Sequence, residues 1–400
     1  MKLLVVLSRV PYPLEKGDKL RAYHLVTRLA RHHRIYLFCL TDQRIAPEHL
    51  THLSGYCEHI EVVHLPRWRI LARLTTAAFS RLPFQVAYFH HSIAQRAIDR
   101  AIASFKPDHV LCQLVRTTEY VRYHYDLAKT LDYMDTLSKG MERRTENASF
   151  WSRPLLRAET RRLIAYENLM LDLFDRHVII SAQDRDLLYH PQRDQVHVIP
   201  NGVDTEFFSP RAAPKTHDLL FTGNMNYPPN IDSVLYLVHK VLPLVRKERP
   251  RTTLLISGVD PTPRVRELAR TDPLITVSGR VPDIRESYAA ATVFAAPMQI
   301  GTGLQNKLLE AMAMRMPCVT SALANNAVGA VPNESILIGT EPADYAGHIL
   351  RLLGDVQECE RIADNGYRFV RSTFDWGRNA EALDKLIASA HTTAPPVPAV

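Results

Sequence analysis

Short apolar segments alternate with helical patterns along the whole chain, and this alternation constrains the fold more than any other feature of the sequence. The first predicted strands, 3–7 and 35–40, are separated by a helical pattern at 20–31. Strands that are apolar on successive residues are typical of parallel sheets covered by helices on both faces. The sequence therefore predicts a doubly wound α/β fold, in which ligands bind beyond the carboxyl ends of the strands. Further strands are expected at 60–64, 110–114, 178–180, 196–199, 219–222, 253–257, 275–277, 293–296 and 318–320.

The length of 400 residues exceeds one ordinary hydrophobic core and predicts two domains. The turn Pro200-Asn201-Gly202-Val203-Asp204 and a Pro-rich connector separate two runs of α/β alternation, so we place the boundary there. The expected parts are a first domain at 1–205, a second at 206–374, a helix at 375–390 that packs back on the first domain, and a disordered tail at 391–400.

Charge and composition narrow the classes of partner. The net charge of +7 and the pI near 9.1 indicate an anionic partner, either nucleotide phosphates, lipid headgroups or nucleic acid. The five cysteines are scattered without a Cys-x-x-Cys pair, which favours reduced thiols over a disulfide framework or a zinc site. No run approaches the roughly 20 apolar residues that span a bilayer, and we interpret the apolar start of the chain as a strand.

The segment 293–321 contains, in order, a strand, a glycine loop, a helix and a second strand. A helix start leaves backbone N–H groups unpaired, and Gly301 and Gly303 allow an anion to approach them, so this segment predicts a phosphate site. Lys307 and Glu310 share one helix face and could hold opposite ends of a ligand. The alternative is an ordinary solvated Lys/Glu pair, which contributes a few tenths of a kcal/mol.

Two cationic segments lie in the predicted first domain. The loop after the first strand carries Lys16, Asp18, Lys19 and Arg21, and it is either a ligand-facing loop or a plain solvated connection. Segment 66–82 mixes arginines with Trp68 and leucines, which fits a helix on an anionic membrane surface or an ordinary amphipathic surface helix.

Several motifs in order resemble the glycosyltransferases of family 4 (group 1). They are the Asn201-Gly202-Val203-Asp204 turn between two α/β domains and Asn306-Lys307-x-x-Glu310-Ala311-Met312-Ala313 near the end of the second. The resemblance implies a GT-B fold, with two Rossmann-like domains facing each other across a cleft. The first loop and Gly223-Asn224-Met225-x-Tyr227-x-Pro229-Asn230 further resemble the bacterial sugar transferases found with exopolysaccharide and exosortase (PEP-CTERM) systems.

The resemblance assigns roles to single residues. The second domain would bind a nucleotide-activated sugar and the first an acceptor, with retention of the anomeric configuration. Glu310 would bind the ribose hydroxyls, and Gly17 would approach the donor phosphate from the first domain. The other donor-binding candidates are Gly223, Asn224, Gly301, Thr302, Gly303 and Leu304.

The sequence departs from the family pattern at two places in the second domain. Thr302 stands where the family has the first glutamate of its Glu-(seven residues)-Glu motif, and segment 223–230 lacks the usual cations. A pyrophosphate needs cations in a partly dry cleft. The expected replacements are Lys307, Arg280, Lys16, Lys19 and Arg21, with Lys307 also stabilising charge in the transition state.

The family's catalytic histidine is not evident in this chain. Asp132 and Asp135, at the carboxyl end of a strand, could orient or deprotonate the acceptor hydroxyl. The alternative is that Asp135 caps the following helix.

We therefore expect a metal-independent transferase without a bound cofactor, which moves a sugar from a nucleotide-sugar to a lipid-linked or polysaccharide acceptor in exopolysaccharide biosynthesis. We expect a cytoplasmic protein, peripheral on an anionic membrane surface, with no nucleic-acid partner. The alternatives are a GT-B nucleotide-sugar epimerase and a catalytically degenerate scaffold that binds nucleotide or membrane.

Overall fold

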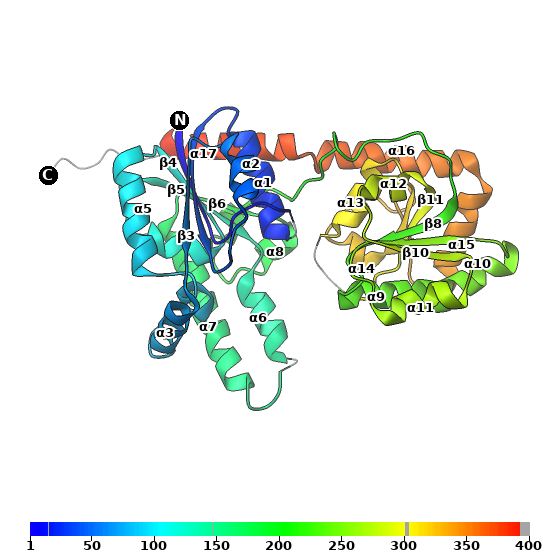
Figure 1. Cartoon of the computed structure of the whole chain (residues 1–400), viewed down its shortest axis with the longest axis horizontal. Helices are drawn as coiled ribbons and strands as arrows, with labels where there is room; N and C mark the ends of the chain where they lie inside the picture. Colours follow the sequence, from blue (N-terminus) through cyan, green and yellow to red (C-terminus); the bar gives the residue numbers. More distant parts are fainter. Residues whose placement is uncertain (15, 147, 301–303, 393–400) are drawn as a thin grey trace. The chain divides into compact units, whose positions relative to one another are not determined.

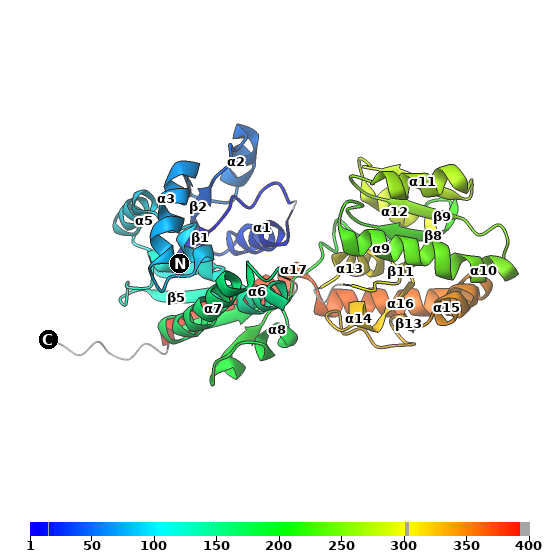
Figure 2. The ribbon, with the colours of Figure 1, turned by 90° about the horizontal axis from the view of Figure 1, so that it is seen from below.

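The computed structural model describes residues 1–14, 16–146, 148–300 and 304–392, which form two domains (Figures 1 and 2). The first domain comprises Met1–Asn201 and the carboxyl-terminal segment from Trp376 onward, and the second comprises Gly202–Asp375. The boundary thus lies a few residues before the expected position. The tail that we expect to be disordered lies, from residue 393, outside the described residues.

The first domain is built on a seven-stranded parallel sheet with the order β3-β2-β1-β4-β5-β6-β7. Its strands are β1 (Lys2–Leu7), β2 (Arg34–Thr41), β3 (His59–His64), β4 (His109–Gln113), β5 (Ala128–Met134), β6 (Arg176–Ile179) and β7 (His197–Val198). Its helices are α1 (Gly17–Leu29), α2 (Pro47–Ser54), α3 (Arg67–Ala78), α4 (Phe84–Ala87), α5 (Ser92–Phe105), η1 (Val115–Tyr120), α6 (Leu137–Glu146), α7 (Arg153–Leu173), α8 (Ala182–Asp186), η2 (Arg193–Gln195) and α17 (Trp376–Thr392).

The central strand β1 shows why the sheet is covered on both faces. Leu3, Val5 and Leu7 point into one buried cluster, which they share with residues of α1 and α17. Leu4 and Val6 point into a second cluster, shared with residues of α5, η1 and α7. Because successive side chains of a strand point to opposite faces, an apolar run of this kind requires cover on both.

The helix α17 returns the chain to the first domain. Trp376 at its start is fully buried and stacks on His24 of α1, with ring centroids 4.9 Å apart. Further along, Asp384 lies 2.7 Å from His33. The last helix is therefore part of the first domain's core, as the sequence predicts for 375–390.

The second domain contains a six-stranded parallel sheet with the order β10-β9-β8-β11-β12-β13. Its strands are β8 (His217–Thr222), β9 (Leu254–Ser257), β10 (Ile275–Gly279), β11 (Ala291–Ala296), β12 (Cys318–Ser321) and β13 (Leu337–Gly339). Its helices are α9 (Pro228–Tyr236), η3 (Leu237–Val241), α10 (Leu242–Glu248), α11 (Pro263–Thr271), α12 (Ile284–Ala289), α13 (Asn306–Ala313), α14 (Ala322–Asn325), α15 (Pro342–Gly354) and α16 (Val356–Thr373). The prediction of two doubly wound, Rossmann-like domains is confirmed. In each sheet the strand order reverses beside the first strand, between β1 and β4 and between β8 and β11.

A buried ion pair joins α1 to β5 inside the first domain and corrects two site predictions. Arg21 and Asp132 have almost no exposed surface, and the Nε of Arg21 donates to the Oδ2 of Asp132 at 2.5 Å. The Nη1 of Arg21 also donates to the carbonyl of Ile199 at 2.9 Å and to the Oδ1 of Asn201 at 3.1 Å. Arg21 is thus not available to a phosphate, and Asp132 is not available to an acceptor hydroxyl.

Removing one partner of this ion pair should destabilise the first domain strongly. Arg21→Met leaves a buried carboxylate unpaired, so we expect a loss of about 3–5 kcal/mol, and the double variant Arg21→Met/Asp132→Leu should recover much of it. The three tryptophans, Trp68, Trp151 and Trp376, all lie in the first domain, so their fluorescence in urea reports this domain alone. An unchanged midpoint for the single variant would contradict the structural role.

Candidate functional site

The second domain gathers polar residues at the point where its strand order reverses. The loop Gly223–Tyr227 follows β8, and the segment from Pro297 to the start of α13 follows the neighbouring strand β11. Both loops therefore leave the carboxyl edge of the sheet side by side, which is where doubly wound sheets bind ligands. The predicted candidates Gly301, Thr302 and Gly303 lie outside the described residues.

Lys307, in the first turn of α13, is held near the loop after β8. Its Nζ donates a hydrogen bond to the Oδ1 of Asn230 on α9 and lies 4.9 Å from the centre of the Phe221 ring. Burial lowers the pKa of Lys307 to about 8, and the neighbouring carboxylate of Glu310 opposes this shift. A poorly hydrated ammonium group of this kind would gain from an anionic ligand.

Glu310 lies one turn further along α13 and is fixed by Tyr288. The buried hydroxyl of Tyr288 donates to the Oε2 of Glu310 at 2.7 Å and lies 2.8 Å from the hydroxyl of Thr222. Burial raises the pKa of Glu310, against the hydrogen bond from Tyr288 and the charge of Lys307. Lys307 and Glu310 are therefore not an ordinary solvated surface pair.

Two glycines allow the loop after β8 to pass close to its neighbour. The backbone of Gly258 has φ +144°, and a Cβ built there would lie 1.8 Å from the carbonyl oxygen of Gly223. Gly223 itself has φ +155°, and a Cβ there would meet the side-chain amide of Asn230 at 2.6 Å. The predicted donor-binding residues Gly223 and Asn224 thus lie beside Asn230, whose Nδ2 donates to the carbonyl of Asn224 at 2.9 Å.

The remaining predicted residues of the second domain are less closely held. Arg280 follows β10 and is exposed, and no side-chain partner is recorded for it among the described residues. Leu304 is half-buried against the core of the domain. Asn230 lies in the first turn of α9, after the N-cap residue Tyr227, and its side chain connects Lys307 to the loop.

The first domain also gathers charges at the point where its strand order reverses. Arg9 follows β1 and pairs with Asp18 at 2.5 Å, while Arg116 follows β4 in η1. Both arginines line a cavity of about 360 Å³ together with Asp42 and Tyr88. The predicted loop residue Asp18 therefore orients Arg9, which the sequence did not single out.

Arg116 is largely withdrawn from water. Its Nη2 donates to the Oε1 of Gln85 at 2.7 Å, while its buried Nε has no hydrogen-bond partner among the described residues. Burial lowers the pKa of Arg116, and the charge of Arg9 lowers it further. An anionic group in this cavity would therefore meet two guanidinium groups.

Asp135 follows β5 at the same edge of the sheet. Burial by the surrounding protein raises the pKa of its carboxyl to about 6, although one side remains open to solvent, and Asp184 raises it further while Arg116 opposes the shift. The first turn of α6 has another cap, since the N–H of Ser138 donates to the Oε1 of the buried Glu167 at 3.1 Å. Asp135 is thus not needed as a helix cap.

The loop residues Lys16, Gly17 and Lys19 lie at the start of α1. Lys16 and Gly17 are exposed, and Lys19 is half-buried. A Cβ built on Gly17 would meet no atom within 4 Å, so packing inside the described first domain does not require a glycine there.

Comparisons with known proteins found a family match within the second domain. Residues 216–355 match the family of group 1 glycosyl transferases. This match includes Gly223, Tyr288, Lys307 and Glu310, and it agrees with the predicted resemblance over that part of the chain. None of the described helices is long and apolar enough to cross a bilayer.

Similar proteins cover nearly the whole chain. An uncharacterized 44.6 kDa protein in the cps region of Klebsiella pneumoniae is 22% identical over 393 residues, which is 94% of this chain and 96% of that protein. A sucrose-phosphate synthase from Thermosynechococcus elongatus has a TM-score of 0.67 at 16% identity and covers 98% of this chain and 100% of its own. Anabaena HepE, solved in complex with UDP, has a TM-score of 0.66 at 15% identity over 97% of this chain and 100% of its own. The GT-B fold is thereby confirmed, and the comparisons support a glycosyltransferase.

In the second domain, the close approach of the loop after β9 to the loop after β8 should depend on Gly258. Gly258→Ala drives a methyl group into the Gly223 carbonyl, so we expect a loss of more than about 2 kcal/mol in stability. Gly347→Ala in α15, where a Cβ meets no atom within 4 Å, is the matched control and should be neutral or slightly stabilising. Calorimetric unfolding measures both, and equal melting temperatures for the two variants would contradict the account.

Proposed function

We propose that this protein is a glycosyltransferase that moves a hexosyl group from a nucleotide-sugar to an acceptor. The main observation in support is the Lys307–Glu310 pair, which hydrogen bonds to Asn230 and Tyr288 hold in place. The pair lies where the strand order of the sheet reverses, within the residues that match the family. Glu310 would accept hydrogen bonds from the ribose hydroxyls, and Lys307 would meet the diphosphate. That Anabaena HepE was solved with UDP supports a nucleoside diphosphate as the ligand.

The chemistry that this site supports is stabilisation of the leaving nucleoside diphosphate. Negative charge grows on the diphosphate as the bond to the sugar breaks, and a fixed cation in a partly dry site stabilises it without reorganisation. Lys307 and the start of α13 would supply that positive field, with Arg280 as a further cation. We propose transfer with retention and without a metal ion. A chelator should then leave the rate unchanged.

The acceptor would bind to the first domain, at the edge that carries Arg9, Arg116 and Asp135. Asp135 is the group that could orient or deprotonate an acceptor hydroxyl, because its raised pKa makes it a better proton acceptor than an ordinary aspartate. Similarity to a protein of a cps region supports a role in surface-polysaccharide synthesis, with a lipid-linked or polysaccharide acceptor. We place this reaction at the cytoplasmic face of a membrane.

The donor is identified by thermal shift with a panel of UDP-, GDP-, ADP- and TDP-sugars, since a ligand that binds only the native state raises the melting temperature. One nucleotide should stand out, and acceptor-dependent release of its diphosphate should follow. Turnover that needs no acceptor would indicate an epimerase instead, and the absence of any shift or turnover with a competent acceptor would indicate a scaffold.

Substitutions on α13 should distinguish binding of the phosphates from binding of the nucleoside. Lys307→Ala should weaken nucleoside diphosphate binding by about tenfold or more while nucleoside binding changes little, because only the phosphates meet the ammonium group. Glu310→Ala should weaken both ligands by about tenfold. Calorimetric titration measures these affinities, with the exposed Lys247→Ala as the matched control. If Lys307→Ala lowers the affinity for the nucleoside as much as the affinity for the nucleoside diphosphate, Lys307 does not bind the phosphates.

The pH dependence of turnover should report Asp135. A general base acts when ionised, so kcat/KM should rise with pH through about 6 and level off above it. Asp135→Asn should remove this limb and lower the rate by about 100-fold or more. Arg116→Gln should move the limb to higher pH, because the charge of Arg116 lowers the pKa of Asp135. A limb that persists in Asp135→Asn belongs to another group.

A further inference from the structure

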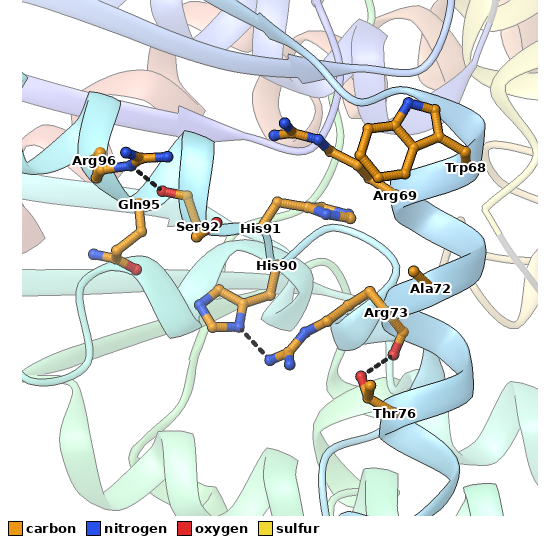
Figure 3. A pocket seen from close by; sticks show the side chains of 10 residues that line it. All are labelled: Trp68, Arg69, Ala72, Arg73, Thr76, His90, His91, Ser92, Gln95 and Arg96. Carbon is orange, nitrogen blue, oxygen red and sulfur yellow. Dashed lines mark hydrogen bonds between the residues drawn. The ribbon is translucent and has the colours of Figure 1, made fainter.

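A second, larger cavity of the first domain lies between α3 and the start of α5. Its volume is about 740 Å³. Figure 3 shows Arg73 reaching from α3 toward His90, with Trp68 and Arg69 one turn earlier on the same helix. The lining contains three arginines and no carboxylate, and its charged residues are Arg69, Arg73 and Arg96.

None of these arginines forms an ion pair within the described part of the chain. The Nη2 of Arg73 donates to the Nδ1 of His90 at 3.0 Å, and the guanidinium of Arg69 lies 5.0 Å from the centre of the Trp68 ring. The Nε of Arg96 donates only a long bond, of 3.4 Å, to the carbonyl of Ser92. The three guanidinium groups thus keep donors that no carboxylate in the cavity satisfies.

The two histidines of the cavity add hydrogen-bonding groups and little charge. Burial lowers the pKa of His90 to about 4, helped by the charge of Arg73, and burial also lowers the pKa of His91. His90 is therefore neutral near pH 7. Its Nδ1 accepts from Arg73, which leaves the proton on Nε2. The cavity presents a positive field together with neutral donors.

Like charges that line one concave surface raise its potential and attract anions of matching size. Guanidinium groups match the oxygens of a phosphate by forming paired N–H donors, and the cavity volume has room for more than a single ion. The neighbouring surface of α3 and its end is apolar and exposed, since Trp68 is 67%, Leu71 65% and Phe79 95% accessible to solvent.

We infer that the cavity between α3 and α5 binds an organic phosphate, at a site distinct from the Lys307–Glu310 site of the second domain. The phosphate contacts Arg73 and Arg96, and the apolar residues of α3 lie beside whatever the phosphate carries. That this phosphate belongs to the acceptor rests on the proposed function. The shared chemistry is a phosphate ester, which a lipid headgroup or a soluble phosphorylated sugar could supply.

The experiment compares the full-length protein with Arg73→Gln/Arg96→Gln, each saturated with the nucleoside diphosphate that the thermal-shift panel selects, so that the nucleotide site is not free. One arm measures co-sedimentation with vesicles of phosphatidylcholine that contain or lack phosphatidic acid. The other arm titrates glycerol 3-phosphate by calorimetry. The matched control, Arg31→Gln/Arg44→Gln, removes the same two charges from exposed positions of the same domain outside the cavity.

The parent protein and the control should bind one of the two probes, and the cavity variant should bind it at least about tenfold more weakly. Loss in the vesicle arm alone identifies a lipid phosphate, and loss in the calorimetric arm identifies a soluble one. The inference is overturned if the parent binds neither probe, or if the cavity variant and the control lose the same amount of binding affinity for the probe.

Two control measurements distinguish failure of this inference from failure of the proposed function. Tryptophan fluorescence in urea checks that the first domain of the cavity variant is folded, and binding of the selected nucleoside diphosphate checks the second domain. If the parent binds the selected nucleoside diphosphate and shows acceptor-dependent turnover but binds neither probe, the phosphate site in the cavity alone is refuted. A parent that binds phosphate in the cavity but transfers no sugar would refute the proposed function alone.

Discussion

Both sheets of this protein are buried on two faces, and this constraint decides where polar chemistry can occur. Leu3 and Leu4 of β1 point into opposite cores, so neither face of the first sheet is open to a ligand. The loops that leave the carboxyl ends of the strands are where doubly wound sheets bind ligands. In the first domain Arg9 and Asp135 follow two such strands, and in the second domain Lys307 follows β11.

The charges at these edges differ between the two domains in a way that fits their proposed ligands. In the second domain one lysine and one glutamate, held by Asn230 and Tyr288, match a ligand that carries phosphates at one end and hydroxyls at the other. In the first domain Arg116 keeps a buried Nε without a partner among the described residues, which fits a ligand with a negative group. The Arg21–Asp132 pair, by contrast, is closed to solvent and joins α1 to β5, although the Nη2 of Arg21 also has no hydrogen-bond partner among the described residues.

The sequence predicted the fold well because apolar runs are a local signal. The strand expected at 293–296 appears as β11, and the helix expected within 293–321 appears as α13. The strand β13 was not predicted from the sequence.

The site could be predicted only in part. The spacing of Lys307 and Glu310 placed them on one helix face, but their partners come from other elements. Tyr288 was not singled out in the sequence, and the motif that contains Asn230 did not link it to Lys307. Arg21 resembled a ligand-facing cation, and its partner lies 111 residues away in the chain, so only the folded sheet reveals that it is buried.

The central claim is that a nucleoside diphosphate binds at the start of α13. A crystal structure of the protein with UDP, or with the nucleotide that the thermal-shift panel selects, tests it most directly. The account predicts the ribose hydroxyls within hydrogen-bond distance of Glu310 and the phosphates beside Lys307. A nucleotide bound elsewhere, with the carboxylate of Glu310 hydrogen-bonded only to Tyr288, would contradict it.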